Sequence, residues 1–341
     1  MSRRVGYAIF IYSEIHNFVM YRLLEREGGE VLARFQKFYP TSFHEKVSSS
    51  PLMDEFYEKA VSVSGIAKMI NESEEPITIV DIASGRGRFN DALERVTKKK
   101  YNIIEVDISG VQLGKSEDFH LRDKERKGEK FRVIGDMSSV PVAGADAAVL
   151  LNSPNAVVGF YSSFFEKYGK SFEKGFSVKE FGKIRDPEEF KIYVLLNAMM
   201  SSTDKLNILE ATKLLKQDGV LVIGGFARAI SAYPIEEMKG IPLEVRNIEK
   251  FKLNRNVMKL WSDYRGNAVK DQPFFVAAFT KTGEVGKELI EECEKTFKNS
   301  FQALIKSKRF WEILNELEKI EKEKKDAASE IRNAAKKVIK E

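Results

Sequence analysis

The sequence contains little cysteine and little histidine, and it has no long uninterrupted apolar run. The single cysteine, Cys293, excludes an intramolecular disulfide and a cysteine-based zinc cluster, which is typical of a protein from a reducing compartment. The three histidines lie far apart and at no metal-ligand spacing, so neither a metal site nor a Ser-His-Asp arrangement is predicted. No stretch reaches the ~18 apolar residues that a membrane span needs. We therefore expect a cytoplasmic protein with no membrane partner and no metal.

Internal repeats, Pro-rich linkers and Gly/Ser-rich linkers are also missing. The 341 residues are 43% hydrophobic and 31% charged, which supplies enough apolar material for one large domain with extensions. The net charge of +5 is modest for this length, so it permits a polyanionic partner without requiring one. Near the N-terminus, Ser13, Glu14 and Asn17 interrupt an apolar stretch, so we expect a helix there rather than a signal peptide.

Apolar periodicity divides the chain into helical ends and a central region in which strands and helices alternate. Helix-like spacings predict an N-terminal helical cap over 1–75 and a charged C-terminal helix or helical hairpin over 283–341. In the central region, 76–282, four apolar runs alternate with helical or polar stretches, which is typical of βα units and a parallel sheet. These runs read ITIVDI, YNIIEVDI, FRVIGD and DAAVLLN.

Three further strands are predicted later in the central region, at 218–226, near 251–262 and at 274–280. The last two follow each other directly along the chain, which indicates an antiparallel hairpin at one edge of the sheet. The residues between the fourth and fifth strands, 153–216, read as mainly helical, and we expect a helical lid over about 155–205.

The stretch ITIVDIASGRGRFNDAL joins the first strand to a helix through a glycine turn. Gly85 and Gly87 leave backbone N–H groups at the positive end of a helix, which suits a nucleotide-like ligand; a purely structural turn is the alternative. A dinucleotide fingerprint needs a third glycine where this chain has Asn90, so the pattern argues against an NAD-linked oxidoreductase.

This segment resembles motif I of the class I S-adenosylmethionine-dependent methyltransferases, in which a strand ends in an acidic residue followed by G-x-G-x-G. Asp81, Ala83, Gly85 and Gly87 fall on that pattern, and Ala83 replaces its first glycine. The resemblance implies an α/β fold with a doubly wound, seven-stranded, mostly parallel sheet (Rossmann-like), flanked here by N-terminal helices and a C-terminal helical extension. It also implies S-adenosyl-L-methionine as the cofactor, bound in part by these four residues and Ser84.

A second acidic residue, Asp107, ends the strand in YNIIEVDIS, about 20 residues after the turn, where nucleoside-binding α/β folds place the carboxylate that binds the ribose. Glu105 is the competing acid, because strand alternation points both side chains to the same face. Asp107 is favoured because it lies nearer the carboxyl end of the strand. The resemblance places Ile108 against the adenine.

Two more segments follow the pattern of the family. FRVIGDMSSVPV is similar to its G-D-A-x-x-L-P-F segment, which implies that Asp136 bonds the adenine amino group and that Met137 offers a backbone N–H; a strand followed by a turn capped by Asp136 is the alternative. LLKQDGVLVIGGF is similar to its L-L-K-x-G-G-x-L-V strand, which belongs to the scaffold. The resemblance covers roughly residues 66 to 282.

After the fourth strand, Asn152, Ser153 and Pro154 match half of the [DNS]-P-P-[YFW] motif of methyltransferases that act on planar amino nitrogens. This half-match makes Asn152 the candidate catalytic and cofactor-contacting residue, with the next two residues on the substrate side. A strand-end turn capped by Asn152 is the alternative. Phe160 and Tyr161 are the further substrate candidates.

The predicted lid interleaves aromatic and basic residues. These could stack bases and neutralise phosphates, or they could form the core and the wet face of a helical lid, because glutamates are mixed among the lysines. We expect methyl transfer by in-line displacement to a macromolecular acceptor, RNA slightly ahead of protein. The alternative is a nucleic-acid- or protein-binding module that keeps the fold without turnover. The C-terminal helices are candidates for self-association or partner binding.

Overall fold

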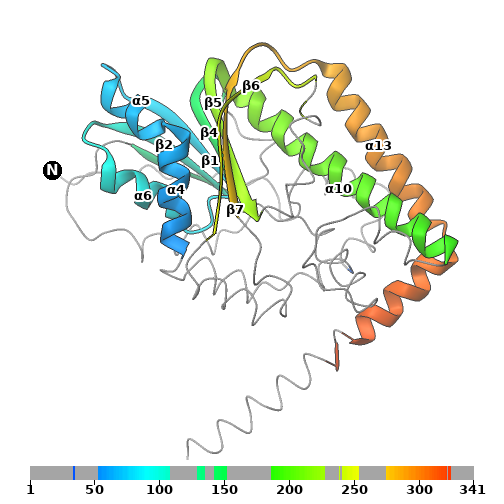
Figure 1. Ribbon diagram of the computed structural model, residues 1–341. Coiled ribbons are helices and arrows are strands. Elements are labelled where there is room, and N and C mark those ends of the chain that lie inside the picture. Colours follow the sequence, from blue (N-terminus) through cyan, green and yellow to red (C-terminus); the bar gives the residue numbers. More distant parts are fainter. Residues whose placement is uncertain are drawn as a thin grey trace, which may run out of the picture.

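Seven strands form a single sheet in the order β3-β2-β1-β4-β5-β7-β6 in the computed structural model (Figure 1). The first five strands in this order pair in parallel, and β7 runs antiparallel to both of its neighbours. The predicted mostly parallel, doubly wound sheet is therefore confirmed. The strands are β1 (Ile77–Ile82), β2 (Tyr101–Asp107), β3 (Lys130–Ile134), β4 (Ala145–Leu151), β5 (Leu215–Phe226), β6 (Leu243–Phe251) and β7 (Phe274–Lys281).

The structure describes residue 34 and most of the central region and C-terminal extension. No helix in this part of the chain combines the length and the apolar character that crossing a membrane requires. The described residues are 34, 53–107, 129–134, 142–151, 186–226, 238, 240–252, 274–320 and 322–323.

Helices cover both faces of the sheet (Figure 1). One face packs against α4 (Asp54–Ser64), α5 (Ile66–Glu72) and α6 (Arg88–Val96), and the other packs against α10 (Pro187–Leu214) and α13 (Lys287–Ile305). Because both faces are buried, β1 and β4 are apolar almost throughout instead of alternating, as is typical of parallel sheets.

The two hydrophobic cores divide the side chains of β1 by the period of a strand. Ile77 and Ile79 are buried with α4, α5 and α6, whereas Val80 and Ile82 are buried with α10 and α13. Successive side chains of a strand point to opposite faces, so Asp81 lies on the α6 side. Asp81, near the end of β1, is thereby placed on the same face of the sheet as α6.

The helix α10 is the longest described element, 28 residues or about 42 Å at 1.5 Å per residue. Asp186 caps its start by accepting a hydrogen bond from the backbone N–H of Glu188 at 2.9 Å, and Pro187 occupies the first helical position. Its buried side chains include Ile192, Leu196 and Met199. Residues 187–205, which the sequence assigned to the end of a lid, thus belong to this core helix, and residues 155–185 lie outside the described residues.

The C-terminal extension is helical, as the sequence predicts, over α13 and again over 308–320. The second helix buries Phe310, Ile313, Leu314 and Leu317 in the same core as α10 and α13. Its apolar stripe is therefore used inside the molecule.

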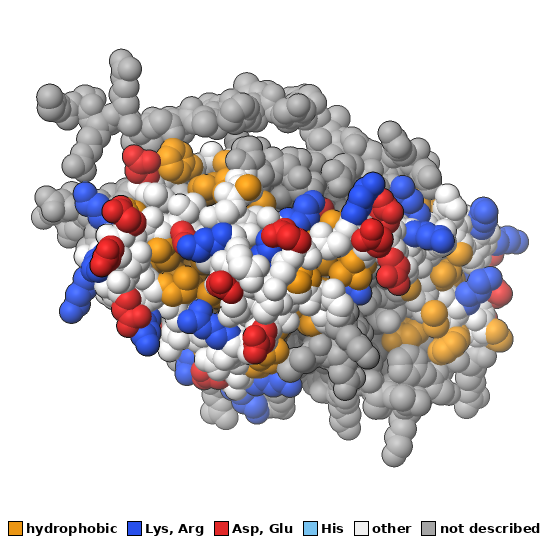
Figure 2. Space-filling model, turned by 90° about the horizontal axis from the view of Figure 1, so that it is seen from above, with side chains coloured by type: hydrophobic (Ala, Val, Ile, Leu, Met, Phe, Trp, Pro, Cys, Tyr) orange, Lys and Arg blue, Asp and Glu red, His pale blue; other side chains and the backbone are white. Residues whose placement is uncertain are grey.

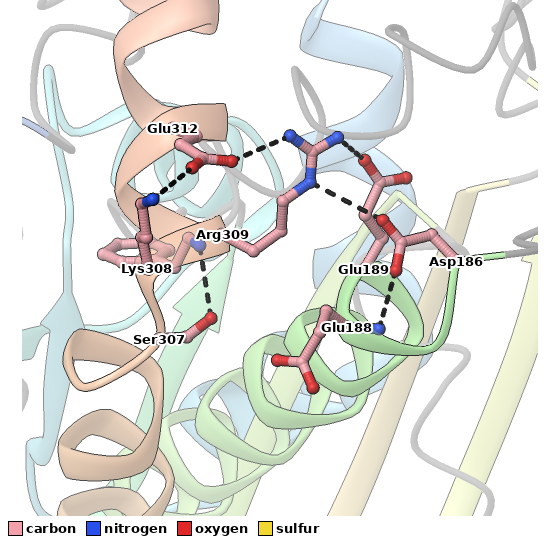
Figure 3. Close-up of polar contacts among 8 residues, drawn as sticks. Asp186, Glu188, Glu189, Ser307, Lys308, Arg309 and Glu312 are labelled. Carbon is pink, nitrogen blue, oxygen red and sulfur yellow. Dashed lines mark hydrogen bonds and ion pairs between the residues drawn. The ribbon is translucent and has the colours of Figure 1, made fainter.

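Arg309 ties this second helix to the start of α10 (Figure 3). Its guanidinium pairs with Glu189, lies 3.6 Å from a carboxylate oxygen of Asp186 and bonds Glu312 at 3.1 Å. These acids raise the pKa of Arg309, which keeps the cation charged at every accessible pH. Acidic side chains near the first turn of a helix interact favourably with the positive end of its dipole. Asp186 and Glu189 therefore stabilise the start of α10 and also attach the C-terminal extension through Arg309.

Arg34 makes a long-range contact with the helix over 308–320. Its guanidinium donates two hydrogen bonds of 2.9 Å to the Glu318 carboxylate and one of 2.6 Å to Asn315, and it lies 5.5 Å from the centre of the Trp311 ring. The bidentate geometry and the aromatic contact are typical of arginine rather than lysine.

One predicted strand was misplaced. The sequence places a strand near 251–262, but β6 spans Leu243–Phe251, and 253–273 lie outside the described residues. The physical reason is that β6 is an edge strand with charged residues along an exposed length, including Glu244, Arg246 and Lys250. Such a strand has no apolar run from which it could be predicted. The expected antiparallel pairing with the 274–280 strand is confirmed.

Candidate functional site at the carboxyl ends of β1 and β2

The turn between β1 and α6 has three residues in the left-handed region. The φ angles are +56° at Ala83, +56° at Gly85 and +73° at Gly87. Glycine adopts this conformation without strain, whereas alanine does so at a cost of about 1–2 kcal/mol. The backbone N–H of Ser84 donates to the Val106 carbonyl at 3.1 Å, and that of Gly87 donates to the Ser84 carbonyl at 2.9 Å. The glycine turn is thus fixed to β2.

Asp107, the last residue of β2, binds the turn directly. Its Oδ2 accepts a hydrogen bond of 2.8 Å from the backbone N–H of Gly85. Asp107 is 9% exposed and lies at the carboxyl end of its strand, which is the edge of the sheet where open α/β folds bind their ligands. A carboxylate can accept about four hydrogen bonds. The bond from Gly85 therefore orients the Asp107 side chain and uses only one of these acceptor positions.

Glu105 has different surroundings. It is fully buried, with Lys130 Nζ 2.5 Å from Oε1 and Arg132 Nε 3.5 Å from Oε2. It stands in register with Asp81 on β1 and with Arg132 on β3. Since both oxygens face cations from β3, Glu105 belongs to the interior of the site. Of the two acids that strand alternation places on one face, Asp107 is the one at its edge.

Asp81 lies under the turn and is 3% exposed. Burial raises the pKa of its carboxyl well above the usual range, Glu105 raises it further, and Lys130 partly opposes the rise. Within the described residues, neither Asp81 Oδ2 nor Ser84 Oγ has a hydrogen-bond partner, although both atoms are buried. Buried polar atoms without partners are costly, so Asp81 Oδ2 and Ser84 Oγ are candidates for contact with a polar ligand.

The two glycines of the turn serve different purposes. A Cβ on Gly87 would lie 2.5 Å from Glu105 Oε1, which is too close for any real contact, whereas a Cβ on Gly85 would meet no described atom within 4 Å. Gly87 therefore allows α6 to approach the buried Glu105–Lys130 pair. Gly85 leaves open space above its backbone, as a ligand cradle requires.

Asn90 stands where a dinucleotide fingerprint has its third glycine, and it bonds to the neighbouring strand. It is 1% exposed on α6, and its Oδ1 accepts a hydrogen bond of 2.8 Å from the hydroxyl of Tyr101 on β2. In dinucleotide-binding folds the third glycine allows close packing of helix on strand. Here a hydrogen bond between side chains makes that helix-to-strand contact.

The structure brings together those predicted residues that it describes. Asp81, Ala83, Ser84, Gly85, Gly87 and Asp107 all lie in or directly beneath the turn. The other predicted site residues lie outside the described residues and stay predictions; they are Ile108, Asp136, Met137, Asn152, Ser153, Pro154, Phe160 and Tyr161.

Sequence reasoning missed the two cations of the site, Lys130 and Arg132. They lie at alternate positions of β3, so both point to the face that carries Glu105. This alternation was available in the letters KFRV.

No protein-family model matches the sequence, and no curated protein matches it. Solved structures do match in fold. The [4+2]-cyclase SpnF is 13% identical, with a TM-score of 0.40, and the match covers 74% of this chain and 95% of that one. Magnesium protoporphyrin IX methyltransferase from Synechocystis, solved with bound S-adenosylmethionine, is 9% identical, with a TM-score of 0.38 and coverage of 79% and 100%. NSun6 from Pyrococcus horikoshii is 17% identical, with a TM-score of 0.39 and coverage of 65% and 52%.

Proposed function

We propose that this chain is an S-adenosylmethionine-dependent methyltransferase whose cofactor binds at the turn between β1 and α6. The observation that carries the proposal is the hydrogen bond between Asp107 and the backbone N–H of Gly85. It joins an acid at the end of β2 to an open glycine turn at the end of β1, which is the arrangement that a nucleoside with an anionic or zwitterionic tail requires.

The residues present fit such a ligand. Asp107 is oriented at the edge of the sheet and can accept hydrogen bonds from ribose hydroxyls. Gly85 leaves space next to the turn, and the buried Ser84 hydroxyl and Asp81 carboxyl offer polar atoms to an amino-acid tail. The acids favour the ammonium, and the backbone N–H groups of the turn favour the carboxylate.

When bound, S-adenosylmethionine supplies an activated methyl group on a sulfonium leaving group. The protein then has to align the acceptor with that methyl and exclude water, and a catalytic base is optional. The described residues would hold the cofactor for this step, because the turn is joined to the Asp107 side chain by one hydrogen bond and to β2 and α6 by backbone hydrogen bonds.

For the acceptor we propose a macromolecule, with RNA ahead of protein. The support is compositional: the segment after β4 interleaves aromatic and basic residues, a combination that can stack bases and contact phosphates. The described surface seen in Figure 2 mixes Lys and Arg with Asp and Glu, so a polyanion would not be drawn to that face by charge. Contact with RNA would therefore involve residues 152–161 and the segment that follows.

Titration calorimetry of the full chain with S-adenosylmethionine and S-adenosylhomocysteine tests the cofactor. Both ligands should bind, and Asp107→Ala should weaken both by tenfold or more, about 1.4 kcal/mol. Glu244→Ala, which removes an exposed acid from β6, is the matched control and should leave both affinities unchanged. No binding of either ligand at millimolar concentration would overturn the proposal.

Transfer of labelled methyl from S-adenosylmethionine to cellular RNA and protein fractions tests the acceptor. Label in RNA supports the proposed acceptor, whereas label in protein alone contradicts it. Cofactor binding without label in any fraction would favour a binding module that keeps the fold without turnover.

A further inference from the structure

Asp81 is a buried acid of the site that forms no ion pair with a cation among the described residues. Its Oδ2 is buried and accepts no hydrogen bond among the described residues. The neighbour in register on β4 is Val149, which is apolar, and the neighbour on β2 is Glu105, which is itself an acid. The charged groups that act on Asp81 come from three elements: Glu105 and Asp107 on β2, Asp91 on α6, and Lys130 on β3, with Arg132 next to Glu105.

Both cations are directed to Glu105. Lys130 Nζ lies 2.5 Å from one of its oxygens and Arg132 Nε lies 3.5 Å from the other. Asp81 Oδ2 has no donor among the described residues, and its neighbour in register on β2 is itself a carboxyl group. A second full negative charge at Asp81 would be strongly disfavoured at this depth.

We propose that Asp81 carries a proton in the free protein and releases it when the ammonium group of the cofactor binds beside it. This inference rests on the proposed function and assigns Asp81 the role of a proton-exchanging ligand rather than a fixed negative charge. The exchange is balanced: the neutral carboxylic acid and the ligand ammonium become a carboxylate–ammonium pair, and one proton leaves to solvent.

The physical reason is that the ammonium supplies what Asp81 lacks. It brings a positive charge and three N–H donors to a buried oxygen that has no hydrogen-bond donor among the described residues. A nearby opposite charge favours the ionised form of a carboxyl, so the pKa of Asp81 falls in the complex. The part of the ligand that carries the ammonium is thereby recognised through a change in protonation.

The exchange couples binding to pH. Below the pKa that Asp81 has in the free protein, each unit of rising pH strengthens binding by up to tenfold, because the released proton enters a solution whose proton concentration is ten times lower. Above that pKa the affinity stops rising. A ligand that lacks the amino-acid tail should show no such dependence.

The experiment is calorimetry of the full chain with S-adenosylhomocysteine in two buffers of different ionisation enthalpy. We expect release of about one proton per ligand bound at a pH below the pKa of Asp81. 5′-Methylthioadenosine, which keeps the nucleoside and lacks the ammonium, should bind without proton release. This pair of ligands separates recognition of the nucleoside from recognition of the tail.

Variants assign the proton. In Asp81→Asn the carboxyl is replaced by a neutral group of similar shape, so the release on binding S-adenosylhomocysteine should vanish and the affinity should become independent of pH, while 5′-methylthioadenosine binds as before. In Asp91→Asn a neighbouring buried acid is removed and Asp81 stays, so the release should persist. Infrared difference spectra should show loss of a carboxylic-acid band when S-adenosylhomocysteine binds to the wild-type protein, and no such loss in Asp81→Asn.

The outcomes are distinguishable. If neither ligand binds, the proposed function falls and this inference falls with it. If both bind and no proton is released, or if release persists in Asp81→Asn, the proposed function stands and the exchange at Asp81 is refuted.

Discussion

The ammonium of Lys281 donates a hydrogen bond of 2.8 Å to the carbonyl of Leu215, the residue at which α10 ends. Lys281 is the last residue of β7, and its side chain is almost completely buried. A cation at the carboxyl end of a helix satisfies an orphan carbonyl and opposes the negative end of the helix dipole. The carboxyl end of α10, the longest described helix, is thus capped by the side chain of the last residue of β7.

Replacement of this lysine tests the closure. Lys281→Met keeps the apolar stem but leaves the Leu215 carbonyl buried without its donor, so we expect a loss of about 1–3 kcal/mol in the free energy of unfolding. Urea denaturation followed by circular dichroism measures it. Lys287→Met, at a side chain that is 85% exposed, should change stability by less than about 0.5 kcal/mol. Equal effects of the two variants would contradict this role.

The two glycines of the turn provide a matched pair of substitutions. Gly87→Ala places a methyl group against the buried Glu105 carboxylate, which Lys130 holds in place, so it should destabilise the fold by more than about 3 kcal/mol. Gly85→Ala meets open space and should lose only about 1–2 kcal/mol, the cost of a left-handed alanine. Thermal unfolding of the two variants distinguishes them, and a larger loss in Gly85→Ala would show that the steric account is wrong.

Ala83 predicts an effect in the opposite direction. With φ at +56° it carries left-handed strain that glycine would not, so Ala83→Gly should raise the free energy of unfolding by up to about 1 kcal/mol. The control is Ala92→Gly in the interior of α6, which should lower it by about 1 kcal/mol. A decrease in both variants would mean that residue 83 is not strained in solution.

Asp81 also makes a prediction about stability and pH. An acid whose pKa is raised by folding stabilises the folded state below its unfolded pKa of about 3.9, and this contribution is lost as the pH rises toward the folded pKa. Relative to the wild type, Asp81→Asn should therefore gain stability as the pH increases from the unfolded pKa toward the folded pKa, by up to about 1.4 kcal/mol for each pH unit. Denaturation curves between pH 4 and 8 measure the difference. A difference that stays constant over this range would contradict the raised pKa.

Most of the sheet could be predicted from the sequence because its central strands are buried on both faces. β1, β4 and β5 are apolar for most of their length, and each run stands out between polar segments. The edge strand β6 could not be found in this way, since its exposed and charged residues are those that protect an edge from further pairing.

The candidate site was predictable where backbone conformation dictates the residue. Gly85 and Gly87 were recognised because a turn with positive φ favours glycine, and Asp107 because it ends a strand next to that turn. The partners of Glu105 were not predicted, because the pairing of β2 with β3 brings Lys130 to it from a part of the chain more than 20 residues away. Sequence spacing does not report contacts across strands.

The contact of Arg34 with Glu318 has a consequence for the order in which this protein can be completed. The two residues are 284 positions apart, so the ribosome synthesises Glu318 long after Arg34. The seven strands of the sheet are all synthesised before Glu318. The sheet can therefore begin to form before Arg34 meets its partner, and the attachment of this early residue is a late step in folding.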